Sequence, residues 1–101
     1  MTWFMARIEL HHASYQDYLN LHSYMAEGGY TTTIRADNGG IFRLPPAEYT
    51  LIAECTLQQA LARAQRAAEK TGKRFAAVVC EYSVCSWVGL EQVQPRARAG
   101  A

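Results

Sequence analysis

The sequence predicts a single α+β domain in which two helices cover one face of a four-stranded antiparallel sheet. Three observations lead to this prediction. Segments with strand-like and helix-like patterns follow one another in the order β-α-β-β-α-β between Trp3 and about Leu90. Each helix-like segment follows a residue that caps helices well, and a strong turn signal separates the second and third strand-like segments. This order is that of the ferredoxin-like fold, which hosts many unrelated functions.

The first strand and the first helix are predicted over residues 3–27. Apolar and polar residues alternate from Trp3 to Leu10, as in a strand with one buried face. The apolar row of this strand consists of Phe4, Ala6, Ile8 and Leu10. Ser14 is placed to cap the following helix, and the carboxylate of Asp17 suits the positive end of the helix dipole. Gly28-Gly29 ends this helix, because glycine adopts the left-handed conformation without strain.

A β-hairpin is predicted in the middle of the chain. Residues Tyr30–Arg35 are rich in β-branched side chains and predict the second strand. Residues Asp37–Gly40 favour a tight hairpin turn, after which the third strand begins at Ile41. Because Pro45-Pro46 has no N–H group to donate, we expect a bulge or break there before pairing resumes over Tyr49–Ala53.

The second helix and the last strand complete the pattern. Thr56 and Gln59 form a capping-box pattern at the start of the helix, and Gly72 ends it. One helix face carries mostly small side chains that allow close approach to the sheet: Leu57, Ala60, Leu61, Ala64, Ala67 and Ala68. Residues Arg74–Tyr82 predict the fourth strand, and Val84–Leu90 predicts a short extra strand after it.

The composition indicates one domain. The chain has 101 residues, of which 50% are hydrophobic, and this suffices for one core without disulfides or structural metal. We expect the domain over residues 1–91 and a flexible tail over residues 92–101, which contain a proline, two arginines and small residues. The formal net charge is +1, so binding of nucleic acid requires a local cluster of cations rather than the field of the whole protein.

The cysteines and the lengths of the apolar runs predict a cytoplasmic protein that does not bind membranes. The three cysteines include no C-x-x-C pair, and their odd number favours a reducing compartment. The first residues become polar too early for a signal peptide. The longest apolar run, Phe75–Cys80, is far too short to cross a bilayer.

Basic residues recur along one flank of the second predicted helix. Their spacing puts them on one stripe beside the apolar face: Arg63, Arg66, Lys70 and Lys73. A row of cations at a regular rise suits a phosphate backbone, but a solvated helix flank has the same pattern, and the pattern by itself favours the solvated flank. Three strand residues extend this candidate nucleic-acid-binding surface across the sheet: Arg7, Arg35 and Arg43.

Two histidines and one carboxylate are the candidates for catalysis. His11 and His12 stand where the first strand ends, and Glu9 shares the outer row of that strand with His11. An imidazole beside a carboxylate acts as a general base or as part of a metal site, whereas the spacing favours turn histidines without a special role. His22 falls on the apolar face of the first helix and is expected to be packed and hydrogen-bonded. The sequence contains no cofactor-binding motif and no metal-ligand spacing, so we expect neither group.

The sheet face opposite the helices is expected to be apolar. It combines Trp3 and Met5 with one row of Phe75–Cys80, a strand that is apolar on both faces. An exposed patch of this kind marks an interaction surface. Cover by a second copy of the chain predicts a homodimer, through this face or through edge pairing of the strand after Val84. The alternative cover is the segment around Trp87.

Short stretches between about Trp3 and Leu90 carry a resemblance to a known family. They read MARIELH over 5–11, DY over 17–18, LH over 21–22, TIR over 33–35, LPPAEY over 44–49 and KTGK over 70–73. These stretches resemble small bacterial proteins grouped with the GhoS antitoxin of the type V toxin–antitoxin systems. The resemblance implies a ferredoxin-like fold related to Cas2, in which Glu9 is the rough counterpart of an acidic residue near the end of the first strand. It also implies an endoribonuclease that cuts the messenger RNA of a small membrane-lytic toxin.

Two hypotheses on function follow. The first is an antitoxin that binds RNA, not DNA, with endoribonuclease activity as an open alternative to binding alone. The second is a non-catalytic ferredoxin-like module that associates with itself or with a partner. A neighbouring gene for a short hydrophobic peptide favours the first hypothesis, and its absence favours the second.

Overall fold

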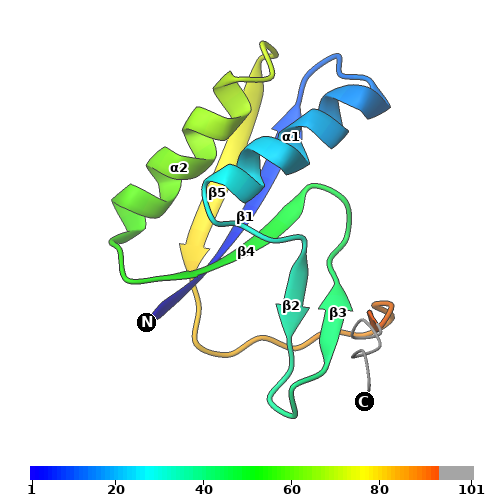
Figure 1. Cartoon of the computed structure of the whole chain (residues 1–101), viewed down its shortest axis with the longest axis vertical. Coiled ribbons are helices and arrows are strands. Elements are labelled where there is room, and N and C mark those ends of the chain that lie inside the picture. The colour runs from blue at the N-terminus through cyan, green and yellow to red at the C-terminus, as the bar shows by residue number, and fades with distance from the viewer. Residues whose placement is uncertain (94–101) are drawn as a thin grey trace, which may run out of the picture.

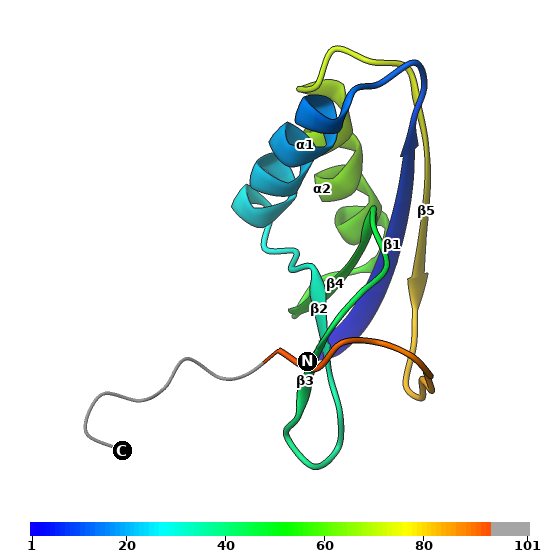
Figure 2. The ribbon, with the colours of Figure 1, turned by 90° about the vertical axis from the view of Figure 1, so that its right-hand side faces the viewer.

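The computed structural model describes residues 1–93 and confirms the predicted α+β class (Figure 1). Its elements are β1 (Thr2–Leu10), α1 (Tyr15–Glu27), β2 (Thr33–Arg35), β3 (Ile41–Arg43), β4 (Glu48–Ala53), α2 (Leu57–Glu69) and β5 (Phe75–Glu81). Figure 2 shows both helices on the same side of β1 and β5. Neither helix has the length and apolar character that crossing a membrane requires, as far as the described residues extend.

Both helices begin after the predicted N-cap residues, and a capping box, predicted only for the second helix, is present at each. In α1 the N–H of Asp17 donates to Ser14 Oγ at 3.2 Å, and the N–H of Ser14 donates to Asp17 Oδ2 at 2.8 Å. In α2 the N–H of Gln59 donates to Thr56 Oγ1 at 3.1 Å, and the N–H of Thr56 donates to Gln59 Oε1 at 2.9 Å. Each box satisfies two backbone donors that a helix start leaves free, which explains why local sequence predicts these starts correctly.

The core lies between the helices and the sheet. The predicted apolar row of β1 is buried, with relative exposures of 5% or less: Phe4, Ala6, Ile8 and Leu10. From α2 the buried residues are all small: Ala60, Ala64, Ala67 and Ala68. Leu57, which the pattern places on the same face, remains 39% exposed in the first turn, and Leu61 is partly exposed. The alanine face allows the backbone of α2 to approach β1 and β5 closely.

The strands form two sheets instead of the predicted single sheet of four strands. β1 is the central strand of an antiparallel sheet of order β4-β1-β5, and β2 pairs with β3 in a separate antiparallel sheet. The division follows the predicted break at Pro45-Pro46, after which Ala47 adopts a φ of 67°. The predicted third strand thus becomes β3 and β4, which have different partners. Thr31 and Thr50 exchange two backbone hydrogen bonds of 2.8 and 2.9 Å, and this bridge joins the hairpin to β4.

The predicted extra strand over Val84–Leu90 is wrong. These residues form no strand, and Val84 and Val88 remain 84% and 94% exposed instead of packing on the sheet. The segment passes the β2–β3 hairpin, and its backbone pairs with β3 only beyond Leu90 (Figure 1). There the N–H of Val93 donates to the carbonyl oxygen of Ile41 at 2.8 Å. Contacts of the domain thus reach Val93, and the remainder of the predicted tail, residues 94–101, lies outside the described residues.

Candidate functional site

Two of the predicted cations on α2 contact α1. Arg63 donates from Nη1 to the carbonyl oxygen of Gly28 at 3.2 Å. Lys70 Nζ lies 2.9 Å from Glu27 Oε1 and 5.7 Å from the centre of the Tyr24 ring. The predicted stripe therefore borders the groove between the helices, where these two side chains hold α1 against α2.

The other two cations of the stripe differ in their surroundings. Lys73 Nζ lies 3.7 Å from Asp17 Oδ2, at the start of α1. The backbone N–H of Ser14 is the main cause of a lowered pKa at the Asp17 carboxyl, and the charge of Lys73 adds to this effect. Arg66 is exposed, and its side chain forms no ion pair with any residue in the range 1–93.

The ion pair of this groove is exposed and weak. The side chains of Lys70 and Glu27 keep 54% and 61% of their exposure. An exposed pair contributes at most about 1 kcal/mol, so a phosphate group can replace the carboxylate at little cost. Arg63, Arg66 and Lys70 also line a hollow of about 250 Å³ between α1 and α2. The groove thus has room for an anionic ligand at three cations.

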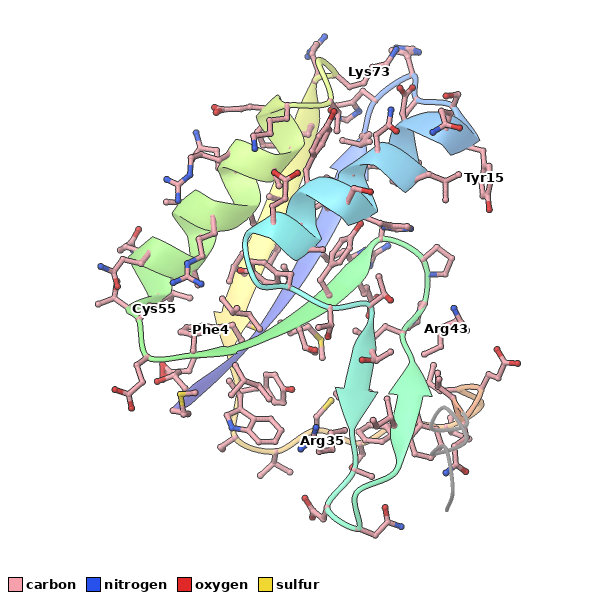
Figure 3. All side chains as sticks on the ribbon, viewed as in Figure 1. Phe4, Tyr15, Arg35, Arg43, Cys55 and Lys73 are labelled. Atoms are coloured by element: carbon pink, nitrogen blue, oxygen red, sulfur yellow. The ribbon has the colours of Figure 1, made fainter. Side chains whose placement is uncertain are left out.

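The three strand arginines lie away from this groove. Arg7 is exposed on the open face of β1. Arg43 pairs with Glu91, with 3.4 Å between Nε and Oε1. Arg35 is exposed at the end of β2. Figure 3 shows Lys73, Arg43 and Arg35 at three separate places on the domain, so these cations belong to different surfaces.

The predicted catalytic residues lie near the end of β1. Glu9 is exposed on the open face of the strand. The backbone N–H of His11 donates to the carbonyl oxygen of Arg74 at 2.8 Å, and His12 is exposed in the turn with a φ of 53°. Within residues 1–93 no ion pair joins Glu9 to either imidazole. A catalytic role for these three residues stays a prediction.

Glu9 instead borders a hollow of about 440 Å³ that His22 also lines. This hollow lies before the start of β4, beside Pro46 and Ala47, where one edge of β1 no longer has a partner strand. Arg7, Tyr15 and Tyr18 complete its polar lining. Tyr18 also supports the free edge of β1, because the N–H of Leu10 donates to its hydroxyl at 3.0 Å.

His22 is packed and hydrogen-bonded, as predicted. Its Nδ1 lies 2.7 Å from the hydroxyl of Tyr49, whose side chain is fully buried. Burial lowers the pKa of His22 and raises the pKa of Tyr49, so His22 is neutral and Tyr49 keeps its proton at neutral pH.

The direction of this hydrogen bond decides what His22 does in the hollow. Among the described residues His22 is the sole hydrogen-bond partner of the Tyr49 hydroxyl, so the hydroxyl donates to Nδ1. The proton of the neutral imidazole is then on Nε2. His22 therefore offers a donor to a ligand rather than a general base.

A third hollow, of about 370 Å³, has three aromatic side chains in its lining, and we call it the aromatic pocket. Its walls come from Trp3 on β1, from residues 34–37 at the end of β2, and from residues 82–87 after β5. The Trp3 and Tyr82 rings meet edge to face, with 6.0 Å between centroids. The Trp87 ring lies 5.4 Å from the Phe42 ring. Trp87 thus packs beside the hairpin.

Sequence reasoning missed the aromatic pocket. Trp3 and Trp87 are far apart in the chain, and the segment that brings them together has no regular structure. The available signal was the density of aromatic and small polar residues just after the fourth strand. Figure 3 shows Arg35 at the end of β2, where this segment passes.

Metal binding has no preformed site in the described part of the chain. No three or more His, Cys, Asp or Glu side chains of residues 1–93 are grouped so as to hold an ion.

Comparison with known proteins leaves the function to be inferred from these residues. No protein-family model, no curated protein and no solved structure matches this chain.

Proposed function

We propose that this protein is an RNA-binding, antitoxin-like protein with a ferredoxin-like fold. The observation that carries the proposal is the cationic groove between α1 and α2, where Arg63, Arg66 and Lys70 line one hollow. Regularly spaced cations neutralise successive phosphates and release counterions, which gives affinity for any RNA strand. The resemblance to the GhoS group supports RNA as the ligand and the messenger of a small membrane toxin as the target.

The fold part of this proposal rests on the Thr31–Thr50 bridge. A ferredoxin-like sheet has four strands, whereas β4-β1-β5 has three. The bridge places Thr31, just before β2, beside β4. This supports the strand order β5-β1-β4-β2, in which β2 is the fourth strand and pairs with β4 only at this bridge. The two helices on one sheet face agree with this assignment (Figure 2).

Neutralising the groove is expected to weaken RNA binding. The triple variant Arg63→Gln/Arg66→Gln/Lys70→Gln removes three cations, and the slope of log affinity against log salt should fall by about 2 for a single strand. Arg66→Gln alone removes one cation that forms no ion pair with residues 1–93. Its matched control is Arg74→Gln, which removes an exposed arginine outside the groove. Fluorescence anisotropy with labelled RNA over a salt series measures the slope. Equal slopes for the wild type and the triple variant contradict the groove as the binding surface.

RNA cleavage is the further step of this proposal, with His11 or His12 as the general base. Incubation with total RNA, with and without chelator, followed by mapping of 5′ ends is expected to reveal discrete cut sites. A loss of cleavage in His11→Asn, His12→Asn or Glu9→Gln identifies the substituted residue as necessary for cleavage, and unchanged cleavage excludes it. His22→Asn is the control, because His22 offers a ligand a hydrogen-bond donor rather than a general base. If the wild type leaves RNA intact both with and without chelator, the proposed cleavage is contradicted and only the proposed RNA binding stands.

The second candidate function is a self-associating module, favoured by the open sheet face. Val78, Ile52 and Trp3 are 67%, 42% and 36% exposed on that face. We propose that a second copy of the chain covers this surface, because contiguous apolar patches mark interaction sites. A stable interface of this kind buries more than about 1,000 Å² in total.

Sedimentation at micromolar concentration is expected to show a species of twice the 11.3 kDa chain mass. Val78→Lys should return the chain to a monomer, because a charge would be buried at the centre of the interface. The matched control is Val88→Lys, which adds the same charge at a side chain 94% exposed away from the sheet. A wild type that sediments at the chain mass throughout refutes the dimer.

A further inference from the structure

We propose that the aromatic pocket holds one unpaired nucleobase of a bound RNA strand, with the adjoining phosphate at Arg35. This inference rests on the proposed RNA-binding function and adds a second contact site to it. The pocket lies at the end of β2, whereas the cationic groove lies between the helices. One site follows the backbone of the strand, and the other accepts a base.

The walls of the pocket suit a flat aromatic ligand. Trp3, Tyr82 and Trp87 line a hollow of about 370 Å³, and Trp3 is still 36% exposed, so ring surface is open to a ligand. The Trp3 and Tyr82 rings stand at 88° to each other, so a ligand that stacks on one ring lies perpendicular to the other. Unstacked bases of single-stranded RNA bind on aromatic side chains in this way.

The polar groups of the pocket suit a nucleotide better than an apolar ligand. Arg35 is exposed, and its guanidinium forms no ion pair with residues 1–93, so it is available to a phosphate. Asp37 and the hydroxyls of Ser83 and Ser86 add an acceptor and further hydrogen-bonding groups for a base edge. An apolar ligand would desolvate these groups without replacing their hydrogen bonds.

The pocket is held in shape before any ligand arrives. The segment that forms one wall is tied at its start, where the N–H of Tyr82 donates to the carbonyl oxygen of Trp3 at 2.9 Å. It is tied again beyond the pocket, where the N–H of Arg43 donates to the carbonyl oxygen of Glu91 at 2.9 Å. A preformed site binds more tightly than one that must order on binding.

A neighbouring hollow gives the strand a path out of the pocket. This hollow, of about 610 Å³, shares Trp3, Asp37, Tyr82 and Ser83 with the aromatic pocket. A base in the pocket therefore leaves room beside the same two rings for the base of the next nucleotide, while the carboxylates of Asp37 and Glu81 keep its phosphate outside this hollow. A strand, and not a single mononucleotide, is the ligand that uses both hollows.

Tryptophan fluorescence tests the inference directly, because the two tryptophans of the chain both line the pocket. Single-stranded polyadenylate is expected to quench the emission, and adenosine 5′-monophosphate is expected to quench it with weaker affinity. A ribose-phosphate oligomer of equal length without bases should bind through the cationic groove and leave the emission unchanged.

Variants separate the pocket from the groove. Trp87→Ala is expected to weaken polyadenylate binding about tenfold and leave the base-free oligomer unaffected, whereas Trp87→Phe keeps a ring and most of the affinity. Arg35→Gln is a surface change and should weaken adenosine 5′-monophosphate binding several-fold, with Arg74→Gln as the matched control. If Trp87→Ala does not fold, Arg35→Gln is the variant that tests the inference. An affinity of Arg35→Gln for adenosine 5′-monophosphate equal to that of the wild type then overturns it.

The outcomes distinguish the two proposals. Polyadenylate that binds without changing the tryptophan emission, or that binds Trp87→Ala as tightly as the wild type, overturns the base pocket and leaves RNA binding in place. Quenching by the mononucleotide without binding of any RNA strand overturns the proposed function and keeps the pocket as a nucleotide site. Absence of both signals overturns both proposals.

Discussion

Replacing Phe4 with alanine is expected to lower the free energy of unfolding by about 3–5 kcal/mol, the largest effect of any single change considered for this domain. Phe4 has no exposed surface and lies on the central strand β1, opposite Leu51 of β4 and Glu81 of β5 in the register. The sheet is held in place on both sides of Phe4, so the cavity left by the ring collapses only in part. The loss then includes the cavity as well as the transfer of the ring to water.

Urea denaturation followed by circular dichroism measures this loss as a lower midpoint at an unchanged slope. The matched control is Val88→Ala, which removes apolar atoms from a side chain 94% exposed and should change stability by no more than about 0.5 kcal/mol. A loss below about 1 kcal/mol for Phe4→Ala contradicts the buried position of this row.

The burial of Phe4 is an example of what local sequence predicts well. Alternation along β1 and the two capping boxes depend on residues at most a few positions apart, so the sequence carries their full signal. The same holds for the alanine face of α2. Leu21 of α1, by contrast, is fully buried although the helix has apolar and aromatic residues on more than one side. Tertiary packing against the sheet determines which of those sides is buried, and the local sequence pattern does not show which side that is.

Pairing between distant segments explains the differences in the sheet. The pattern over Val84–Leu90 is typical of a strand, but the segment is positioned by Trp87 on Phe42 and by Gln92 opposite that same residue. Similarly, the break at Pro45-Pro46 was predictable, while the choice of different partners for β3 and β4 depends on the Thr31–Thr50 bridge.

The candidate site shows the same division. The spacing of the α2 cations predicts that they share a flank, yet their contacts with α1 join residues far apart in the chain, such as Lys70 and Glu27. The groove therefore becomes visible only once the helices are packed. The aromatic pocket depends even more on the fold, because Trp3 and Trp87 come from the two ends of the described chain.

The second large effect is expected at the hydrogen bond between Tyr49 and His22. Tyr49→Phe removes the hydroxyl that donates to Nδ1 and leaves this nitrogen, part-buried on α1, without a partner. An unsatisfied acceptor of this kind costs about 1–3 kcal/mol. Tyr49→Phe/His22→Leu makes both partners apolar and should recover most of this loss, since the orphaned nitrogen is then absent. Urea denaturation of the wild type and the variants measures the coupling between the two sites.

The same pair is expected to make stability depend on pH. Burial lowers the pKa of His22 below its ordinary value of 6.5. Between the two pKa values the imidazole is protonated in the unfolded chain and neutral in the folded chain. The resulting stability is fully present above pH 6.5 and is lost as the pH falls from there through the folded-state value. The lowered pKa of Asp17 acts in a separate window, below its ordinary value of 3.8. His22→Gln removes the titrating group, so its unfolding free energy should change less with pH below 6.5 than that of the wild type. Identical pH profiles for the two proteins would show that His22 titrates alike in the folded and unfolded chain, contrary to its burial against Tyr49.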